Sequence, residues 1–486
     1  MSQPKVCVTV TGKTTRELRQ RRDAAVGADL IELRLDGIED LDVAGALQGR
    51  SKPAIVTCRA VRDGGNFTGS ESDRSRILLE AFKNGSEYVD IEWTGAEDSR
   101  ITEHAPRVVL SWHEFERCPR DLTDRYRAMR ATGAAVVKIA VGIQRLVDLL
   151  PLAALGKRAA REGERAAMIG MGGPGVSSRI LAGRFGACWT YAGSAAPGQI
   201  DAVRLVKEFR FRDISDTTEI YGVVGNPVMH SVSPAMHNAG FTAISRDAVY
   251  IPLEAADVHD FFDFAEAFGI AGASVTAPFK QEVYRGAQDV DMVGRRLGAV
   301  NTVRATAQGW TAMNSDVGGF LEPLQEIFNL SGARATVIGG GGAAKAASAA
   351  LVDAGASVQV CARCRDQAEE VASVSGATVD VFPPRPGSWD LLVNATPIGM
   401  VPRVDESPVS ALSLDGSLVY DLVYNPQPTL LMREAALRGC RTLGGLAMLV
   451  AQAKQQFEWW MGIRPPESVF EDAACERLTV GAEETL

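Results

Sequence analysis

Histidine is scarce in this chain, with 5 residues among 486, and no H-E-x-x-H pattern occurs. Zinc sites depend on imidazole and thiolate ligands at short, regular spacings. We therefore expect no metal. Long hydrophobic runs are also missing: no stretch approaches the roughly 20 apolar residues that a membrane-spanning helix needs. We therefore expect no membrane partner.

Positive charge is not in excess either. The 51 Lys and Arg are outnumbered by 60 Asp and Glu, which gives a formal net charge of -9. An acidic chain has no diffuse electrostatic attraction to nucleic acid or to an anionic membrane surface. This balance argues against a nucleic-acid partner. Small anionic substrates need only a local basic pocket and are the expected partners.

The 8 cysteines are scattered. Residues 1–10 contain no basic segment followed by an apolar run, so we expect no secretory leader, free thiols and a cytoplasmic location. One C-x-x-C joins Cys361 to Cys364. It could be a redox pair or half of a metal site, but we favour chance at a strand end because no second pair accompanies it.

A rhythm of apolar, β-branched runs separated by helix-like segments extends over residues 1–200. The predicted strands are 6–10, 30–35, 54–58, 88–91, 107–111, 135–140, 166–171 and 187–192. Eight alternating β and α segments predict a (β/α)8 TIM barrel, which we assign to residues 1–212.

A new α/β pattern begins at Ile220. Around Ala335 a strand, a glycine run, an alanine-rich helix and another strand follow in order, as in half of a Rossmann-type fold. We assign an α/β substrate domain to 219–320, completed by a C-terminal helix at 446–465. A Rossmann-type NADP-binding domain would occupy 321–445, so the whole chain is of the α/β class.

Polar residues of the first half fall at the C-terminal ends of the predicted strands, where barrel enzymes carry their chemistry. Lys138 lies inside an apolar run, and burying a lysine is costly unless it is paired or deprotonated. A lysine at a sheet edge with its head in water is the alternative. Because His113 and several arginines share the rim, we favour a lysine that attacks a ketone, with His113 as general base and acid.

The motifs of this half resemble type I 3-dehydroquinate dehydratases over nearly all of residues 5–200. The matching stretches are I-E-L-R-L-D (31–36), C-R-A-x-x-D-G-G (58–65), S-W-H-E-F (111–115), V-K-I-A (137–140), M-G-x-x-G-x-x-S-R (171–179) and A-P-G-Q (196–199). The resemblance implies that Lys138 forms a Schiff base with the C3 ketone. His113 would then remove the C2 proton and later protonate the departing C1 hydroxyl.

The resemblance also assigns the remaining residues of this site. Asp63 would orient the histidine and Arg179 would bind the substrate carboxylate. The other implied substrate contacts are Glu32, Arg34, Arg59 and Gln199. Two positions depart from the family, which usually has Glu in place of Asp63 and Ser in place of Ala195. These departures leave the reaction class unchanged, but they could alter the rate and the contacts of the loop that would cover the substrate.

The run T-V-I-G-G-G-G-A-A-K (336–345) follows a predicted strand and opens a predicted helix. Glycines there let backbone N–H groups approach a pyrophosphate, although a glycine run alone could be a tight turn. NAD-binding folds usually end the next strand with an acid, whereas this chain has Arg363 and Arg365. These suit the 2′-phosphate of NADP, unless they are two solvated surface arginines.

Further polar motifs are G-N-P-V-M-H-S-V-S-P-x-x-H-N (225–238), S-V-T-A-P-F-K (274–280), G-A-V-N-T (298–302) and N-S-D (314–316). A Lys–Asp pair beside a carbonyl can pass a proton to the alkoxide formed by hydride transfer. Singly, each residue could belong to a surface ion pair of little consequence.

With N-A-T-P-I-G-M (394–400), Y-D-L-V-Y-N-P-x-x-T (420–429) and G-L-A-M-L-V-A-Q (445–452), these motifs resemble shikimate dehydrogenases over about residues 220–465. The resemblance implies Lys280 and Asp316 as the catalytic pair. It implies substrate contacts by Ser231, Ser233, Thr276, Asn301, Gln452 and Tyr424, the last near the nicotinamide. The implied cofactor contacts are Gly339, Gly341, Gly342, Ala343, Arg363, Arg365, Asn394, Thr396 and Met448.

The serine spacing of Ser231 and Ser233 is of the shikimate type, because relatives that prefer quinate tend to alter one of them. Ser274 stands where bacterial relatives often have Asn. Ala362 and Gln367 stand where NADP contacts are often polar or basic. These departures bear on cofactor preference more than on fold.

The two predicted activities are consecutive, because the product of the dehydratase, 3-dehydroshikimate, is the substrate that the dehydrogenase reduces to shikimate with NADPH. The sequence therefore predicts a bifunctional shikimate-pathway enzyme, both a lyase and an oxidoreductase. An enzyme acting on quinate, or oxidising dehydroshikimate, is one alternative. A non-catalytic metabolite-sensing regulator is the other. We disfavour it because Lys138, His113, Lys280 and Asp316 are all present and no basic DNA-binding segment is seen.

Overall fold

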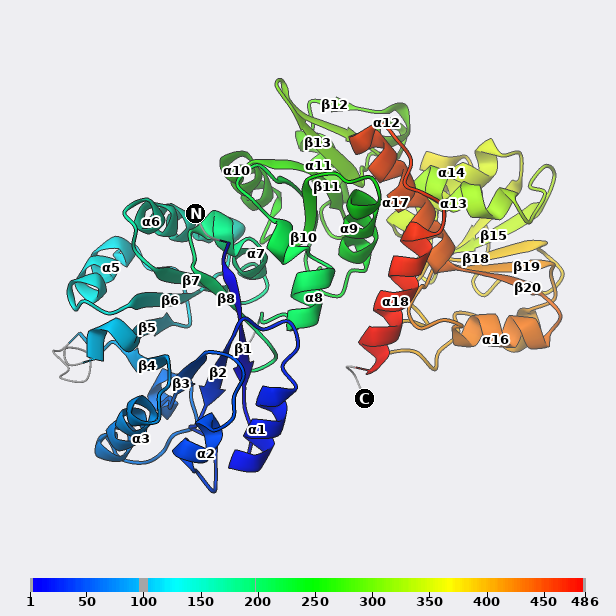
Figure 1. Ribbon diagram of the computed structural model, residues 1–486. Helices are drawn as coiled ribbons and strands as arrows, with labels where there is room; N and C mark the ends of the chain where they lie inside the picture. Colours follow the sequence, from blue (N-terminus) through cyan, green and yellow to red (C-terminus); the bar gives the residue numbers. More distant parts are fainter. Residues whose placement is uncertain (1–2, 96–103, 197, 484–486) are drawn as a thin grey trace. The chain divides into compact units, whose positions relative to one another are not determined.

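A computed structural model describes residues 3–95, 104–196 and 198–483 (Figure 1). The chain divides into two compact units. Unit 1 comprises Met1–Pro234 and Asp247–Ile270, and unit 2 comprises Ala235–Arg246 and Ala271–Leu486.

Unit 1 contains a parallel sheet of eight strands in the order β7-β6-β5-β4-β3-β2-β1-β8. The strands are β1 (Lys5–Val10), β2 (Leu30–Arg34), β3 (Ala54–Thr57), β4 (Tyr88–Glu92), β5 (Val108–Glu114), β6 (Val136–Gly142), β7 (Ala166–Met171) and β8 (Trp189–Ala192). The backbone N–H of Cys188, just before β8, donates to the carbonyl of Ala166 on β7 over 2.7 Å. The sheet is thus a nearly closed barrel, and the predicted barrel fold is confirmed.

Helices surround this sheet, so its strands are buried on both faces and their sequences are near-continuous apolar runs. The α-helices are α1 (Thr15–Asp23), α2 (Val43–Leu47), α3 (Glu71–Lys83), α5 (Leu122–Ala131), α6 (Leu149–Arg161), α7 (Val176–Ile180) and α8 (Ala202–Lys207). Every residue of β6 is buried, Lys138 included.

Two strands extend further than the sequence predicted. The predicted strand 107–111 is β5, which runs to Glu114, and the predicted strand 135–140 is β6, which runs to Gly142. The reason is mutual pairing: His113 lies opposite Ala140, and Glu114 lies opposite Val141. His113 is therefore held on a strand and not on a loop.

Unit 1 also contains β9 (Glu219–Gly225) and β10 (Ala248–Glu254), which pair in parallel, followed by α10 (Val258–Phe268). Helix α10 buries Phe261, Phe264 and Phe268. The ring of Phe268 lies 5.3 Å from that of Phe185 in the barrel. Figure 1 shows α10 next to α6.

In unit 2, β11 (Ile270–Val275), β13 (Thr302–Thr306) and β14 (Gly309–Met313) pair in antiparallel fashion, and β12 (Asp289–Val290) pairs in parallel with β14. The helices of this part are α11 (Lys280–Gly286), α12 (Met292–Leu297) and α13 (Asp316–Gln325), together with most of α9 (Ser233–Ala243).

A second sheet of unit 2 has six parallel strands in the order β17-β16-β15-β18-β19-β20. They are β15 (Arg334–Ile338), β16 (Ser357–Cys361), β17 (Thr378–Val379), β18 (Leu391–Asn394), β19 (Leu418–Asp421) and β20 (Arg441–Gly444), with helices α14 (Gly342–Asp353), α15 (Arg365–Ser375) and α16 (Leu430–Leu437). This order matches the doubly wound dinucleotide fold, whose ligand crevice lies where the order reverses, between β15 and β18. The predicted Rossmann-type fold is confirmed.

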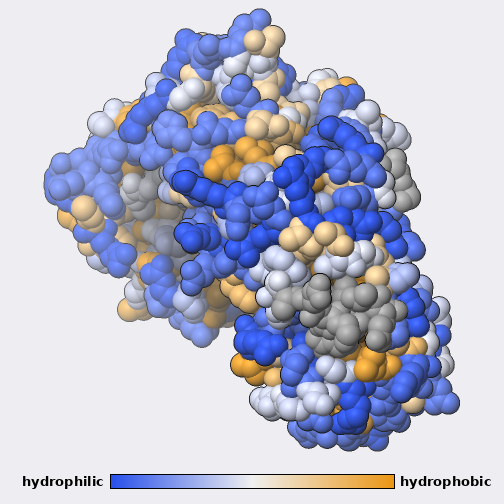
Figure 2. Space-filling view, turned by 90° about the vertical axis from the view of Figure 1, so that its left-hand side faces the viewer, coloured by the Kyte–Doolittle hydropathy of each residue, from blue (hydrophilic) through white to orange (hydrophobic). Residues whose placement is uncertain are grey.

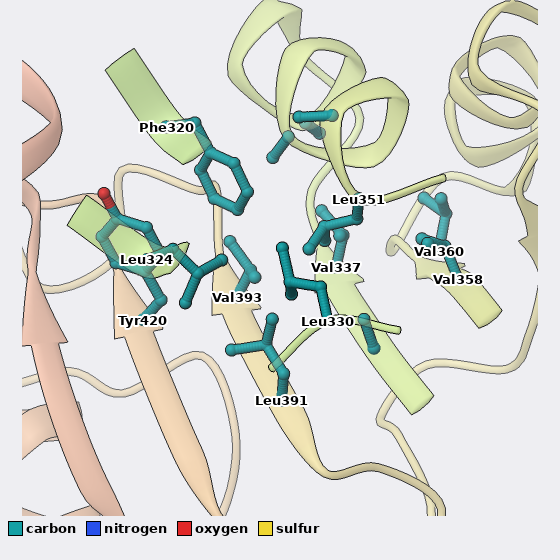
Figure 3. Close-up of a cluster of buried hydrophobic side chains, with 14 of the residues drawn as sticks. Phe320, Leu324, Leu330, Val337, Leu351, Val358, Val360, Leu391, Val393 and Tyr420 are labelled. Atoms are coloured by element: carbon teal, nitrogen blue, oxygen red, sulfur yellow. The ribbon is translucent and has the colours of Figure 1, made fainter. Parts of the chain in front are cut away.

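The core of this sheet is a cluster of buried hydrophobic side chains (Figure 3). Phe320 and Leu324 from α13 pack against strand residues such as Val393 and Tyr420. The rings of Phe320 and Tyr420 stack with centroids 5.0 Å apart. Helix α13, which begins at Asp316, is thereby fixed against the nucleotide-binding sheet.

The C-terminal region contains α17 (Gly445–Met461) and α18 (Val469–Glu483). Helix α17 ends where Gly462 adopts a φ of 74°, a conformation that glycine accepts without strain. No helix in the described part of the chain is long and apolar enough to cross a bilayer. The face shown in Figure 2 is mostly hydrophilic, with hydrophobic residues in small separate patches.

Candidate active sites

A cavity of about 670 Å³ opens at the C-terminal ends of the barrel strands. All eight residues predicted for the first site line it: Glu32, Arg34, Arg59, Asp63, His113, Lys138, Arg179 and Gln199. Thr9, Phe115, Met171 and Tyr191 line it as well and were not predicted. The barrel therefore gathers side chains from distant parts of the sequence, as parallel strands in a barrel require.

Lys138 is buried in this cavity and is paired. Its Nζ lies 3.1 Å from Oδ2 of Asp90 and 3.3 Å from Oε1 of Glu32. The same Nζ lies 4.0 Å from the centroid of the Tyr191 ring, a favourable cation–π distance. Two carboxylates and an aromatic face thus fix the position of the amine. Of the alternatives considered for Lys138, the structure shows a buried lysine and not a solvated one.

The two carboxylates beside Lys138 are held in their ionised form. Burial alone would raise the pKa of Glu32 and of Asp90, but Lys138 and Arg59 outweigh it and hold both pKa values below the usual range. Hydroxyl groups support the charges: Thr57 donates to Glu32 over 2.9 Å, and Ser111 donates to Asp90 over 2.7 Å. A cation formed at the lysine nitrogen therefore meets two anions.

His113 lies on the same rim as a neutral base. Burial lowers the pKa of His113 well below its ordinary value, and the charges of Arg59 and Lys138 lower it further. Its Nε2 lies 2.9 Å from Nη1 of Arg59. Since arginine only donates, Nε2 is the acceptor and the ring proton resides on Nδ1.

Asp63 is on the short helical turn Val61–Asp63, next to Arg62, with 3.3 Å between Oδ2 of Asp63 and Nε of Arg62. Among the described residues, no hydrogen bond joins Asp63 to His113. The resemblance to the dehydratase family had assigned the orienting role to Asp63. The imidazole is hydrogen-bonded to Arg59.

An ionic network that sequence reasoning missed lies beneath this rim. Arg59 pairs with Asp90 over 3.0 Å and with Glu92 over 3.2 Å, and Arg74 also contacts Glu92. Burial raises the pKa of Glu92, and the charge of Asp90 adds to the effect. The signal was present in the sequence: Asp90 and Glu92 alternate in the strand Y-V-D-I-E, so both point to the same face.

Arg179 differs from the other arginines of the cavity because, within the described chain, it has no acidic partner. It is 3% exposed and donates only to the carbonyl of Tyr191, over 3.4 Å. Burial lowers the pKa of its guanidinium to about 10. By contrast, Arg34 is engaged by Asp36 through two contacts of 2.8 Å. An unpaired buried cation in a cavity favours an anionic ligand.

Gln199 closes the barrel cavity from the loop after β8. Its Oε1 accepts from the backbone N–H of Ala195 over 2.8 Å, and its Nε2 donates to Thr9 over 3.3 Å. Ala195 is the position where the resembling family has serine. The loop is therefore held through its backbone and not through the missing hydroxyl.

The second site lies in unit 2, around a cavity of about 290 Å³. Lys280, the first residue of α11, places Nζ 2.6 Å from Oδ2 of Asp316, the first residue of α13. The predicted residues that line this cavity are Thr276, Lys280, Asp316, Gly342 and Ala343. Asn314 and Lys345, to which no role had been assigned, line it as well. The two predicted catalytic residues are therefore brought together beside the glycine run.

Asn301 organises this site. Its Nδ2 donates to the other carboxylate oxygen of Asp316 over 2.8 Å and to Gln452 over 3.4 Å. Gln456, a residue that sequence reasoning missed, donates to the carbonyl of Asn301 over 3.2 Å and accepts from Ser274 over 2.6 Å. The predicted Asn301 and Gln452 thus lie in one hydrogen-bonded network with Lys280 and Asp316, the predicted catalytic pair.

Three predicted substrate residues lie outside this network. Ser231 and Ser233 belong to unit 1, where the Oγ of Ser231 accepts from the backbone N–H of Ser233 over 3.2 Å. Tyr424 follows β19 and is half-buried, and burial raises the pKa of its hydroxyl.

A cavity of about 490 Å³ lies over β15, β16 and β18 and is lined by the predicted Gly339, Gly341, Arg363 and Thr396. Gly339 has a φ of 136°, and a Cβ there would lie 2.8 Å from the carbonyl of Ala395. Gly341 caps α14, which begins at Gly342, and a Cβ at either would meet only open space. The helix N-terminus is therefore accessible to a phosphate group.

The charges of this cavity suit NADP. Arg363 and Arg403 both line it, and neither forms an ion pair with any residue that the structure describes. No acidic side chain is found among its described lining residues, so an NAD-type contact to the ribose hydroxyls is missing there. The residues present therefore fit a dinucleotide with a 2′-phosphate. Sequence reasoning missed Arg403, which enters from the loop after β18.

Three other predicted cofactor residues take different places. Arg365 is 74% exposed and pairs with Glu369 on its own helix. Asn394 is buried and accepts from Thr396 through its Oδ1, so it supports a lining residue. Met448 packs against the core of the nucleotide-binding sheet. Cys361 and Cys364 are both free thiols.

A barrel with an ion-paired lysine in its mouth, followed by a Lys–Asp pair beside a dinucleotide fold, defines a lyase joined to a nicotinamide-nucleotide dehydrogenase. The chain belongs to the family of bifunctional 3-dehydroquinate dehydratase/shikimate dehydrogenases. It is 31% identical over 486 residues to the chloroplastic bifunctional enzyme of Arabidopsis thaliana, an alignment that covers 92% of this chain and 79% of the relative.

Matches to each half agree with this assignment. The family model of type I 3-dehydroquinase matches residues 6–216, that of the shikimate dehydrogenase substrate binding domain matches 223–303, and that of the shikimate 5′-dehydrogenase C-terminal domain matches 445–475. The shikimate dehydrogenase (NADP(+)) of Halobacterium salinarum is 40% identical over 267 residues, covering 54% of this chain and 100% of that protein.

Among solved structures, a shikimate dehydrogenase in complex with NADP+ is 31% identical with a TM-score of 0.52, covering 55% of this chain and 97% of that one. Shikimate 5-dehydrogenase from Thermus thermophilus, in complex with NADP(H) and shikimate, is 32% identical with a TM-score of 0.50 and covers 54% and 100%. The family, the two enzyme classes and the cofactor NADP predicted from the sequence are confirmed.

Proposed function

We propose that the barrel cavity dehydrates 3-dehydroquinate through a Schiff base at Lys138 and that the Lys280–Asp316 pair serves the reduction of the product. The observation that carries the first part is the position of Lys138. Its amine is fixed by Asp90 and Glu32 in the same cavity as a neutral histidine and an unpaired arginine. A nucleophile, a base and an anion-binding group thus line one cavity.

The proposed dehydration begins when Arg179 binds the substrate carboxylate. The Lys138 amine adds to the C3 carbonyl carbon, and water leaves the resulting carbinolamine to give a protonated imine. His113 removes the C2 proton, the electron pair moves toward the imine, and an enamine forms. The C1–O bond then breaks as His113 returns its proton to the leaving hydroxyl. Hydrolysis of the new imine consumes one water and frees Lys138, so one water is lost overall.

Asp90 and Glu32 stabilise the positive charge at the lysine nitrogen in the ammonium and again in the protonated imine, and the neutral amine between these two states is the nucleophile. Their oxygens lie 3.1 and 3.3 Å from Nζ, within ion-pair distance, and all three side chains are buried. Arg59 orients the imidazole of His113 through the hydrogen bond to Nε2. Arg34 and Gln199 complete the substrate contacts, and Asp63 contributes from the rim.

For the second reaction, NADPH would, when bound, supply the hydride for the substrate ketone. Lys280 and Asp316 hold the proton that the developing alkoxide takes up, because they form one hydrogen-bonded pair beside the cavity. Asn301 fixes the free oxygen of Asp316, and Thr276 and Gln452 contact the substrate. The expected contacts of Ser231, Ser233 and Tyr424 stay predictions.

The nucleotide would be held by the backbone of Gly339, Gly341, Gly342 and Ala343, with Thr396 beside it. Arg363 and Arg403 would bind its 2′-phosphate, because they are cations without ion-pair partners in the described chain. Arg365, Asn394 and Met448 would act from the periphery of the site, through charge or by supporting its walls.

We also propose the domain bounds predicted above, 1–212, 219–320 with 446–465, and 321–445. The family-model matches to 6–216 and 223–303 support the first division. A cytoplasmic location without a nucleic-acid partner is proposed from the 8 free cysteines and the net charge of -9. Cell fractionation tests the location.

The experiment that tests both activities is one incubation of the protein with dehydroquinate and NADPH, in which shikimate formation is followed. Lys138→Ala should lose shikimate formation from dehydroquinate but keep it from dehydroshikimate. Lys280→Ala should accumulate dehydroshikimate. A Lys138→Ala variant with full dehydratase activity would overturn the assignment. Parallel rates with quinate test the alternative substrate, and a quinate rate above the shikimate rate would favour it.

A further inference from the structure

Within unit 1, the loop that follows β6 of the barrel is anchored to a part of the chain that belongs to the other enzymatic half. The loop runs from Ile143 to the short helical turn Leu146–Asp148. Its anchor is α10, which lies beyond the barrel in the segment matched by the shikimate dehydrogenase substrate binding domain. Helix α10 of the dehydrogenase half thus supports a loop of the dehydratase barrel.

The centre of this anchor is Asp260, whose side chain is fully buried. Its Oδ2 accepts from the backbone N–H of Leu146 over 2.9 Å, and its Oδ1 accepts from that of Val147 over 3.0 Å. A third donor is the N–H of Ala256, in the connection between β10 and α10, over 2.9 Å. Three backbone donors satisfy the buried carboxylate, and hydrogen bonds to an ionised acceptor are the strong ones.

A second, weaker contact flanks the first. Arg145 donates to Asp257 over 2.7 and 3.2 Å, but both side chains are about two-fifths exposed. Exposed pairs contribute little on their own. The packing of Phe268 against Phe185 completes the docking of α10 on the barrel. The orientation of the loop therefore depends mainly on Asp260.

The anchored loop continues directly into the dehydratase cavity. Gly142, Ile143 and Gln144 line that cavity, and the Nε2 of Gln144 donates to the carbonyl of Glu116, in the loop after β5, over 3.0 Å. Only one residue separates this wall from the first N–H that Asp260 holds. A shift of the anchor is therefore transmitted to the cavity wall.

The neighbouring loop, which follows β7, contacts β10, the strand that precedes α10. A Cβ on Gly173 would lie 2.0 Å from Oε1 of Glu254, the last residue of β10, so the loop backbone touches that side chain. Gly172 of this loop lines the cavity, and the loop leads into α7 with Arg179. Two consecutive walls of the dehydratase cavity are thus supported by β10 and α10.

We propose that Asp260 is a positioning residue for the dehydratase, acting through the loop after β6, although it belongs to the dehydrogenase half. This inference rests on the proposed function of the barrel cavity. It implies that the dehydratase needs β10 and α10 to hold the wall of its substrate-binding cavity. The dependence has one direction: the dehydratase depends on this part of the dehydrogenase half, and the dehydrogenase does not depend on the loop after β6.

The test is steady-state kinetics of Asp260→Asn in the full chain. An amide offers one acceptor oxygen where the carboxylate uses two, so one loop N–H loses its partner. We expect the KM for dehydroquinate to rise roughly 3- to 30-fold with a small change in kcat, the range for effects that pass through packed neighbours. Reduction of dehydroshikimate with NADPH should be unchanged. Faster amide hydrogen exchange confined to the loop after β6 should accompany the KM change.

Two further variants keep the test interpretable. Asp263→Asn removes an exposed carboxylate from the same helix and should leave both activities unchanged. Arg145→Ala removes the exposed ion pair with Asp257 and the longer 3.9 Å contact of Nε with Oδ1 of Asp260. It leaves the three backbone donors to Asp260 in place, so it should raise KM by less than Asp260→Asn does. An unchanged KM in a folded Asp260→Asn protein, or equal losses in both activities, would overturn the proposal. A wild-type protein without dehydratase activity would instead refute the proposed function.

Discussion

Arg59 and His113 share a hydrogen bond in which Nη1 of the arginine lies 2.9 Å from Nε2 of the imidazole. The arginine is itself held by Asp90 and Glu92, so its position is fixed by a buried ionic network. A histidine that faces a guanidinium cannot readily become a second cation. The relationship therefore keeps His113, the proposed general base, neutral and in one tautomer.

A pH profile of the dehydratase tests this relationship. The pKa of His113 is lowered well below its ordinary value of 6.5 by burial and by Arg59 and Lys138. Because the base form is the active one, kcat/KM for dehydroquinate should stay level as the pH falls from neutrality through that ordinary value, and should fall only at lower pH. A single ionisation with a midpoint at or above the ordinary value would contradict the assignment of His113.

Arg179→Gln should weaken the binding of dehydroquinate without lowering the stability of the fold. The guanidinium is buried without a carboxylate partner in the described chain, so its removal relieves an uncompensated charge. We expect the KM for dehydroquinate to rise by about 10- to 100-fold, the loss of one charged hydrogen-bonding partner. Thermal unfolding should show a Tm that is unchanged or higher. A lowered Tm with an unchanged KM would show that Arg179 serves the fold and not the substrate.

Arg363→Ala and Arg403→Ala should each weaken the binding of NADP+ and leave that of NAD+ nearly unchanged, because only the former carries a 2′-phosphate. A loss of about 10-fold per arginine is expected for a charge-assisted contact. Isothermal titration with each nucleotide provides the measurement. Arg365→Ala is the matched control, since Arg365 is exposed and paired with Glu369. If Arg365→Ala weakened NADP+ binding more than Arg403→Ala does, the assignment of the 2′-phosphate site to Arg363 and Arg403 would be contradicted.

Asp316→Asn should lower kcat of the dehydrogenase by about 100- to 10,000-fold, the usual contribution of a proton-transfer group. The amide keeps the contact with Asn301 possible but removes the charge that pairs with Lys280 at 2.6 Å. Dehydratase kinetics, measured in the same preparation, should not change. Dehydrogenase turnover close to that of the unmodified protein would remove Asp316 from the proposed machinery.

Much of this architecture could be predicted from the sequence because the signals are local. Buried parallel strands are continuous apolar runs, and a glycine run between a strand and a helix indicates a dinucleotide site. The strand 166–171 was predicted with the bounds it has. The ends of β5 and β6 were not, because His113 and Glu114 are kept on a strand by pairing with β6, a contact between distant segments.

In the candidate sites, too, residues in local motifs could be predicted from the sequence, and residues that depend on contacts between distant segments could not. Lys138, His113, Lys280 and Asp316 lie in recognisable motifs, and the structure places each beside a cavity. Sequence reasoning missed Asp90, Glu92 and Arg74 because the ion pairs that join them form only when segments far apart in the sequence meet in the fold. Arg403 was missed because it lies in a loop without periodic pattern, and only the fold carries it to the same cavity as Arg363.

The most direct test of the central claim is mass spectrometry after borohydride reduction of the protein with dehydroquinate. The account predicts one added mass, that of the reduced ligand, on the peptide containing Lys138, and none on Lys138→Ala. Turnover of dehydroquinate with no adduct on that peptide would contradict it.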